Sequence, residues 1–162
     1  DDVLELLLHL VDKSLVVADE GSDGRQRYRL LDTLREYGRE RLLASGESEN
    51  LHRRHARYYL ALAERAEPEL TRAQQAAWID RLAFEEGELW AALVRLAARG
   101  ELQEALRLAA VLGRFWQLRG HLHEGRRRLA SILALPGAEA PTLERAKALD
   151  AAGAAAPRPR TT

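Results

Sequence analysis

The sequence predicts a mostly α-helical fold, in which one β-hairpin near the N-terminus is followed by an array of antiparallel helical hairpins. Three observations lead to this prediction. Apolar residues recur at helical spacing along most of the 162 residues. The turn residues Gly-Ser-Asp-Gly at 21–24 separate two short strand-like stretches. The later helical stretches, of roughly 15–20 residues each, are joined by short connections, which favours antiparallel neighbours.

The N-terminal part contains a predicted helix and the predicted hairpin. Residues 2–12 place leucine and valine at helical spacing. Leu4 and Leu8 add a second apolar stripe, so we expect this helix to be covered on more than one side. Residues 15–18 and 26–31 are the predicted strands.

Everything after the hairpin is predicted to be helical. A helix begins at Asp32, whose carboxylate is a predicted N-cap, and ends at Gly46, a predicted C-cap. A second helix spans about 49–66 and is followed by Pro68. A third stretch covers 71–99, with a predicted break at the Glu-Gly pair near its centre.

Residues 101–119 are apolar nearly all round, which is typical of a helix that lies between neighbours in a stacked array. Its polar stripe is narrow and consists of Gln103, Arg107, Arg114 and Gln117. A further helix is expected over 121–135. A last one is expected to begin near Pro141, a favoured first-turn residue, and to end near Ala152.

Small residues and turns in ALVRLAARGELQEALRLAAVL have the rhythm of a tetratricopeptide-type helix pair. No two segments repeat clearly at that family's 34-residue period. We therefore predict a helical-repeat-like array. The C-terminal GAAAPRPRTT has no periodicity and is predicted to be disordered.

Composition excludes several classes of function. The 25 basic and 25 acidic residues balance, so no global field attracts nucleic acid or membrane. The absence of cysteine excludes disulfides, zinc–thiolate sites and a thiol nucleophile. No membrane span or signal peptide is visible, so we expect a cytoplasmic protein. Methionine is absent even at position 1, so we expect a piece of a longer protein.

Five blocks follow one another in a familiar order: LVDKSLVVAD, RYRLLDTLREYGRERL, HRRHARYYLALAERAEPEL, WIDRLAFEEGELWAAL and ALRLAAVLGRFWQLRGHLHEGRRRL. In this order they resemble the middle of bacterial STAND-type ATPase regulators, the AfsR-like and large LuxR-like transcriptional regulators of actinobacteria. The resemblance covers about residues 2–150. In that family a P-loop nucleotide-binding domain precedes a winged helix, and a helical repeat region follows.

The resemblance implies a domain organisation and a function. Residues 1–46 would be the C-terminal part of the winged helix, 47–152 the repeat-like (TPR-like) array, and 153–162 a disordered tail. The chain would couple its own upstream nucleotide-binding domain to an array that senses an unidentified protein or small molecule. No G-x-x-x-x-G-K-[ST] occurs here, so we expect no ATP or ADP binding and no catalysis by this chain, whereas the parent protein would bind ATP or ADP.

Related signalling ATPases carry a Met-His-Asp nucleotide sensor just after the hairpin. The matching positions here are Leu30, Leu31 and Asp32. Leucine cannot donate a hydrogen bond to phosphate, so Asp32 alone keeps the motif. Its interpretation as a helix cap is favoured over a sensor role.

Direct DNA contact by the hairpin is a weaker interpretation. Arg25, Arg27 and Arg29 alternate and point to one side of the second strand, as minor-groove wings require. The preceding helix, however, offers leucine and acid where base and phosphate contacts need other side chains. Asp19 and Glu20 on the partner strand are placed to pair with the arginines.

Two other groups of side chains are candidate sites. His52 with His55, and His121 with His123, have metal-ligand spacings, but a site needs three or four converging ligands, and His55 is expected to be a satisfied core histidine. A basic cluster is a candidate surface for an acidic or phosphorylated partner, with a solvated helix face as the favoured alternative: Arg114, Arg119, Arg126, Arg127 and Arg128.

The aromatic and acidic residues offer no catalytic site. Trp78, Trp90, Phe115 and Trp116 are expected in the core. The pair at 85–86 lacks an apolar enclosure that would shift a pKa. Two alternatives to the coupling function remain: a free-standing helical interaction adaptor, and a winged-helix DNA-binding module.

Overall fold

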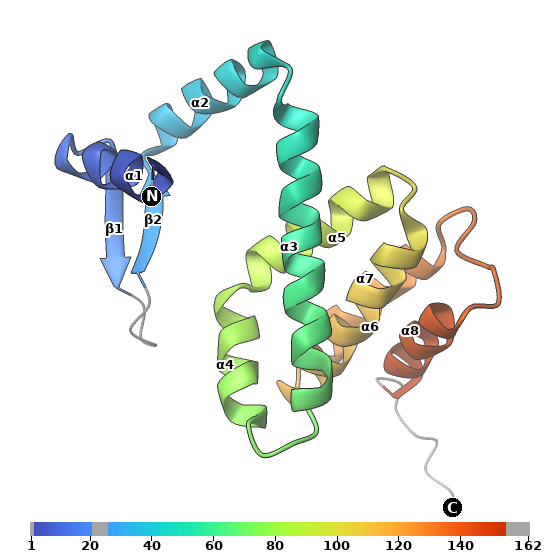
Figure 1. Cartoon of the computed structure of the whole chain (residues 1–162). Coiled ribbons are helices and arrows are strands. Elements are labelled where there is room, and N and C mark those ends of the chain that lie inside the picture. The colour runs from blue at the N-terminus through green and yellow to red at the C-terminus, as the bar shows by residue number, and fades with distance from the viewer. Residues whose placement is uncertain (1, 21–25, 155–162) are drawn as a thin grey trace, which may run out of the picture. The chain divides into compact units, whose positions relative to one another are not determined.

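The computed structural model describes residues 2–20 and 26–154 and is mostly α-helical, with one antiparallel hairpin followed by helices, as predicted (Figure 1). The elements in chain order are α1 (Asp2–Asp12), β1 (Val16–Glu20), β2 (Gln26–Leu30), α2 (Asp32–Ser45), α3 (Ser48–Glu69), α4 (Gln75–Phe84), α5 (Glu86–Ala98), α6 (Leu102–Leu118), α7 (Leu122–Leu133) and α8 (Leu143–Ala154).

The chain divides into two compact units, residues 1–50 and 51–162. The division falls in the first turn of α3, a few residues after the predicted boundary at 46. The first unit contains α1, the hairpin and α2, and the second contains the array.

The hairpin of the first unit pairs β1 with β2 in an antiparallel register in which Val16 lies opposite Leu30 and Asp19 lies opposite Arg27. Val16 is the buried position of β1, and α1 packs against this strand. The predicted turn at 21–24 and Arg25 lie outside the described residues. A loose ion pair joins Arg29 to Asp19 (3.7 Å), one of the pairings expected from the sequence.

Helix α1 has the predicted bounds but not the predicted covering. Its aliphatic side chains are exposed to solvent in large part: Val3 78%, Leu4 59%, Leu6 63%, Leu8 49% and Leu10 36%. An 11-residue helix with this much exposed aliphatic surface is unusual for a soluble unit.

At the start of α2 the prediction of Asp32 as N-cap is wrong. Leu31 occupies the cap position, with extended backbone and no side-chain cap hydrogen bond. Asp32 is the first helical residue, and its carboxylate accepts a hydrogen bond from Arg35 one turn later (2.8 Å). The negative charge still lies at the positive end of the helix dipole. The predicted C-cap is confirmed, because Gly46 is left-handed at φ 75°.

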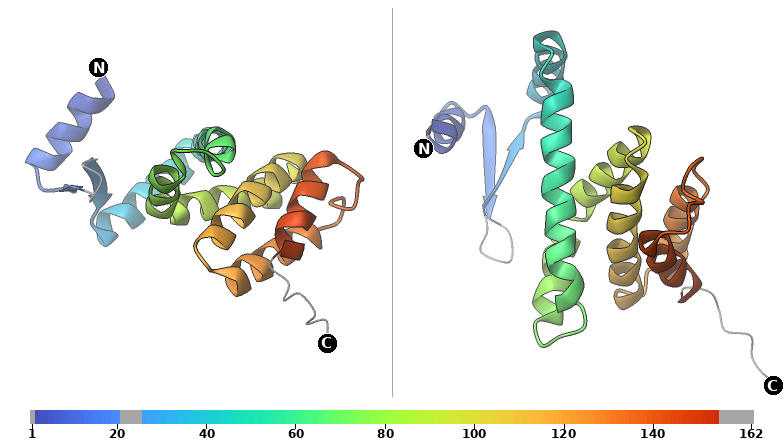
Figure 2. Two further views of the ribbon diagram at one scale, coloured as in Figure 1. Left: turned by 90° about the horizontal axis from the view of Figure 1, so that it is seen from below. Right: turned by 45° about the vertical axis from the view of Figure 1, so that its right-hand side comes forward.

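Helix α6 is the centre of the second unit and packs against α8, α7, α5 and α4 (Figure 2). The predicted sandwiched helix is therefore confirmed. Most of its residues are buried, and they include both aromatic residues: Ala105, Leu106, Leu108, Ala109, Ala110, Val111, Leu112, Gly113, Phe115 and Trp116. The remaining predicted aromatics, Trp78 and Trp90, are partly buried against the same core.

Glycines end α5 and α6 in the same way. Gly100 (φ 73°) and Gly120 (φ 76°) take the left-handed conformation that favours glycine. In each case the glycine N–H and the next N–H bond back to the last turn, the pattern of a Schellman C-cap. These sharp turns return the chain antiparallel and produce the helical hairpins.

Three predicted helix boundaries differ from the structure. Pro68 lies inside the last turn of α3, because one lost backbone hydrogen bond is outweighed by the fully buried Ala66 and Leu70 around it. The stretch from 71 begins as a helix only at Gln75. The predicted break near its centre is confirmed, because Glu85 separates α4 from α5.

The third difference concerns α8. Pro141 is not in the helix, because Thr142 is its N-cap: the Thr142 hydroxyl accepts from the Arg145 N–H (3.3 Å). The helix continues through Ala154, so the first residues of the predicted disordered tail are helical. The rest of that tail, 155–162, lies outside the described residues. Within the described ranges, no helix is long and apolar enough to cross a membrane.

Candidate functional site

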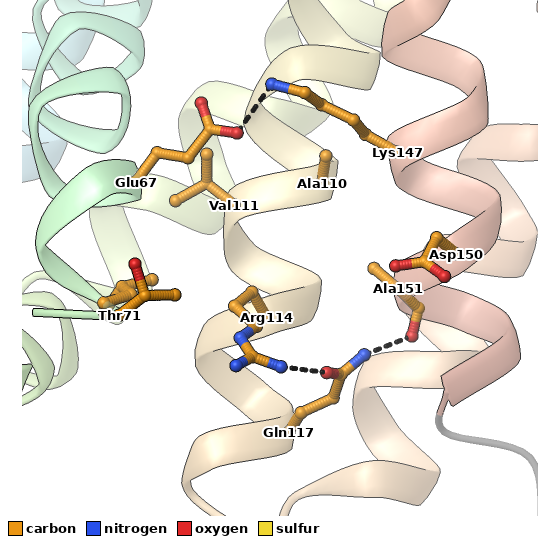
Figure 3. Close-up of a pocket in the computed structure, with 10 residues that line it drawn as sticks. Glu67, Thr71, Ala110, Val111, Arg114, Gln117, Lys147, Asp150 and Ala151 are labelled. Carbon is orange, nitrogen blue, oxygen red and sulfur yellow. Dashed lines mark hydrogen bonds and ion pairs between the residues drawn. The ribbon is translucent and has the colours of Figure 1, made fainter.

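The candidate site is a groove of about 370 Å³ in the second unit, lined by one side each of α3, α6 and α8 (Figure 3). Its floor is the small-residue face of α6, where Ala110 and Val111 are 8% and 3% exposed. Leu70, directly after α3, and Ala151 of α8 complete the apolar surface. The alanines matter because larger side chains at these positions would fill the groove.

An ion pair spans one end of the groove. Lys147 of α8 donates to Glu67 of α3 at 2.7 Å between Nζ and Oε1. Both side chains are nearly half exposed, so solvent screens the pair and its contribution to stability is small. Figure 3 shows it above Ala110 and Val111.

A short relay of polar side chains forms the other end. Gln117 donates from Nε2 to the carbonyl of Ala151 (2.7 Å), which ties α6 to α8. Its Oε1 accepts a long hydrogen bond from Arg114 (3.5 Å). Gln117 thus links α6 to α8 at this end of the groove, whereas Arg114 is held only by a long contact.

The five arginines predicted as a basic cluster have different surroundings. Arg114 lines the groove, and Arg119 lies over the Phe115 ring (5.8 Å). Arg127 pairs with Glu124 at 2.6 Å. Arg126 and Arg128 lie two apart on α7 and therefore on opposite sides of it. Whether any of these arginines binds an acidic or phosphorylated partner stays a prediction.

Arg128 has a structural environment that the sequence did not reveal. Its guanidinium stacks on Trp90 (4.6 Å) and Trp116 (5.3 Å), donates to Glu124 (2.6 Å) and lies 3.7 Å from Glu86. Glu86 in turn accepts the Trp116 indole N–H at 2.9 Å. Hydrogen bonds from Arg128, and next from Arg127, hold the pKa of Glu124 below its ordinary value. This cluster joins α5, α6 and α7 and gives Glu86 two structural partners, Arg128 and Trp116.

His55 is a satisfied, partly buried histidine, as expected. Arg95 donates to its Nδ1 (3.0 Å), which leaves Nε2 to donate to Glu88 (2.8 Å). Both ring nitrogens are thus occupied. Neighbouring Tyr59 donates to Glu85 (3.2 Å), and its pKa is raised by burial and by the charges of Glu85 and Glu88. No three potential ligands converge on a metal position among the residues that the structure describes.

Comparison with known proteins gives one clear similarity. Over 131 residues, 81% of its length, the chain is 44% identical to proteins of Mycobacterium bovis and Mycobacterium tuberculosis that carry the provisional name of HTH-type transcriptional regulators. The chain spans 14% of the length of these curated relatives. No protein-family model and no solved structure matches it. The similarity supports a place for the chain in a transcriptional-regulator family.

Proposed function

We propose that this chain is a non-catalytic segment of a STAND-type ATPase transcriptional regulator of actinobacterial type. In that protein it would couple a nucleotide-binding domain to a sensing helical array. The observation that carries the proposal is the 44% identity to much longer regulators, of which the chain spans 14%. The ordered sequence blocks at 2–150 add the specific family.

The first unit supplies the coupling surface in this proposal. In α1, the exposed aliphatic side chains offer an apolar face of the kind that marks interaction sites. The unit would be the last part of a winged helix that docks on the nucleotide-binding domain in the resting state. Asp32, the one residue that matches the nucleotide-sensor motif, is exposed at the start of α2 and would lie at that junction.

The second unit supplies the sensing array. Its antiparallel helical hairpins would be the start of a TPR-like array, and its groove would offer a concave surface to a protein or small-molecule effector. Effector binding would shift the docking equilibrium of the first unit only to the extent that the docked and released states differ in affinity for the effector. ATP or ADP would be held by the parent's upstream domain, and this chain itself would hold no cofactor and contact neither nucleic acid nor membrane.

The test measures binding between this chain and the polypeptide encoded immediately upstream of it. Surface-immobilised chain is titrated with that polypeptide in the presence of ADP and of a non-hydrolysable ATP analogue. The proposal expects affinities that differ by about fivefold or more, the usual lower bound of allosteric coupling. Equal affinities would contradict coupling. A polypeptide without a P-loop would leave the free-standing adaptor as the better account.

The double variant Leu4→Glu with Leu8→Glu shows whether α1 is the docking surface. Both positions lie on one face of the helix and are about half exposed, so the change should leave the fold intact. We expect it to abolish the nucleotide-dependent binding. Leu43→Glu, at an exposed position of α2, is the matched control and should bind as the unmodified chain does.

A further inference from the structure

Two opposite charges line the groove without an ion-pair partner among the described residues, and both side chains are exposed. Arg114 makes only the long contact to Gln117, and Asp150 has no hydrogen bond or ion pair to any described residue. The remaining charges of the groove, Lys147 and Glu67, neutralise each other. The groove therefore presents one available cation, from α6, and one available anion, from α8.

An apolar floor lies beside these charges. Val111, Ala151 and Leu70 are nearly or fully buried by the surrounding protein and line the groove. Its volume of about 370 Å³ lies in the range of small-molecule sites, which runs from about 300 to 1,000 Å³. Such sites combine an apolar lining with a few polar groups that orient the ligand.

From this arrangement we propose that the groove binds a small zwitterionic ligand with an aliphatic body, of the class of a short peptide. Its carboxylate binds Arg114, its ammonium group binds Asp150, and its aliphatic side chains cover Val111 and Ala151. The inference names a ligand class for the sensing role proposed above. Binding of the ligand to the groove depends on the second unit alone. Only the regulatory effect of that binding rests on the sensing role proposed above.

The charges of the groove disfavour other ligand classes. A purely anionic ligand, such as a free phosphate, would meet the carboxylates of Asp150 and Glu67 together with Arg114. A purely apolar ligand would cover Val111 and Ala151 but would use neither exposed charge. A zwitterion satisfies both charges and adds no net charge to the site.

The probe for the test is leucyl-leucine, titrated calorimetrically into the full 162-residue chain. Two relatives of the probe each lack one charge: N-acetyl-leucyl-leucine has no ammonium group, and leucyl-leucine amide has no carboxylate. Arg114 and Asp150 are exposed, so solvent screens each new ion pair, which is worth at most about 1 kcal/mol, and removal of either charge should weaken binding by up to about fivefold.

Two variants assign each charge to its partner. Arg114→Gln should weaken binding of leucyl-leucine, and this variant should bind leucyl-leucine amide as tightly as leucyl-leucine. Asp150→Asn should bind N-acetyl-leucyl-leucine as tightly as leucyl-leucine. Arg65→Gln, which changes an exposed arginine of α3 outside the groove, is the matched control and should bind as the unmodified chain does.

The proposal fails if leucyl-leucine shows no binding up to about 10 mM, the weak limit of a useful site. It also fails if Arg114→Gln still binds the amide more weakly than leucyl-leucine by the full factor seen for the unmodified chain, or if Asp150→Asn does so for the N-acetyl form. Both results leave the nucleotide-dependent docking of the first unit untouched. Conversely, loss of that docking with intact peptide binding would contradict the coupling function and not the ligand site.

Discussion

Substitution of Gly113 by alanine tests the packing that sets the width of the groove. Gly113 lies on α6 where α7 and α8 approach most closely: a Cβ at this position would lie 2.7 Å from the Ala151 Cβ and 2.8 Å from the Leu129 Cδ1. Carbon atoms in contact are normally about 3.5–4.0 Å apart. The Ala151 Cβ is fixed to its backbone, so α8 itself must move away from α6.

The magnitude follows from two opposing effects. Overpacking of a close-packed core costs about 1–3 kcal/mol. Alanine in place of glycine inside a helix gains about 1 kcal/mol. Because two hard contacts arise at once, we expect the upper part of the overpacking range and a net loss of about 1–2 kcal/mol in the free energy of unfolding.

The assay is urea unfolding followed by tryptophan fluorescence, which reports on the second unit because all three tryptophans lie in it. Gly87→Ala is the matched control. Gly87 is also helical, and a Cβ there meets nothing within 4 Å, so this variant should gain about 0.5–1 kcal/mol. If Gly113→Ala also stabilises the unit, the close approach of α6 and α8 is wrong.

Three further predictions concern the other features of the chain. Arg128→Gln removes the stacking on two tryptophans and the bonds to Glu124, and should cost about 2 kcal/mol in the same assay, whereas Arg126→Gln should change stability by less than about 0.5 kcal/mol. The exposed α1 face should make the isolated chain self-associate, so light scattering should show larger species at high concentration. The double variant Leu4→Glu with Leu8→Glu should form fewer of these species. A strictly monomeric profile for the unmodified chain would contradict this prediction. The folded-state pKa of Tyr59 is raised, so its contribution to the stability of the folded chain is full below the unfolded pKa of about 10 and is lost as the pH rises above it. Tyr59→Phe should therefore flatten the fall in stability at alkaline pH. An unchanged pH profile would refute the role of Tyr59.

Much of the fold could be predicted from local patterns. The period of the apolar residues located the helices, and Gly46, Gly100 and Gly120 marked helix ends because their left-handed conformation is local. The errors arose where tertiary packing outweighs local preference. Pro68 was expected to follow a helix, yet the buried residues around it keep it in the last turn.

Capping was the least predictable feature. Asp32 and Thr142 are both good cap residues by type, and only Thr142 caps a helix. The choice depends on one residue of backbone register, which the apolar period does not determine.

The candidate site was predicted only in part. Arg114 was singled out as one of a run of arginines, but its role as a groove residue depends on α8, which supplies Asp150 and Lys147 from far along the chain. No spacing rule links such positions. The rarity of lysine, present only at 13 and 147, was the available signal for Lys147. In contrast, His55 was correctly interpreted, because an apolar helix face favours a satisfied histidine.

The most direct test of the central claim is to read the coding sequence upstream of the codon for Asp1. The account predicts a G-x-x-x-x-G-K-[ST] motif on a strand-to-helix turn within roughly 200–300 residues, the size of one to two domains. A start codon immediately before Asp1 would contradict the coupling function and leave the helical adaptor as the better account.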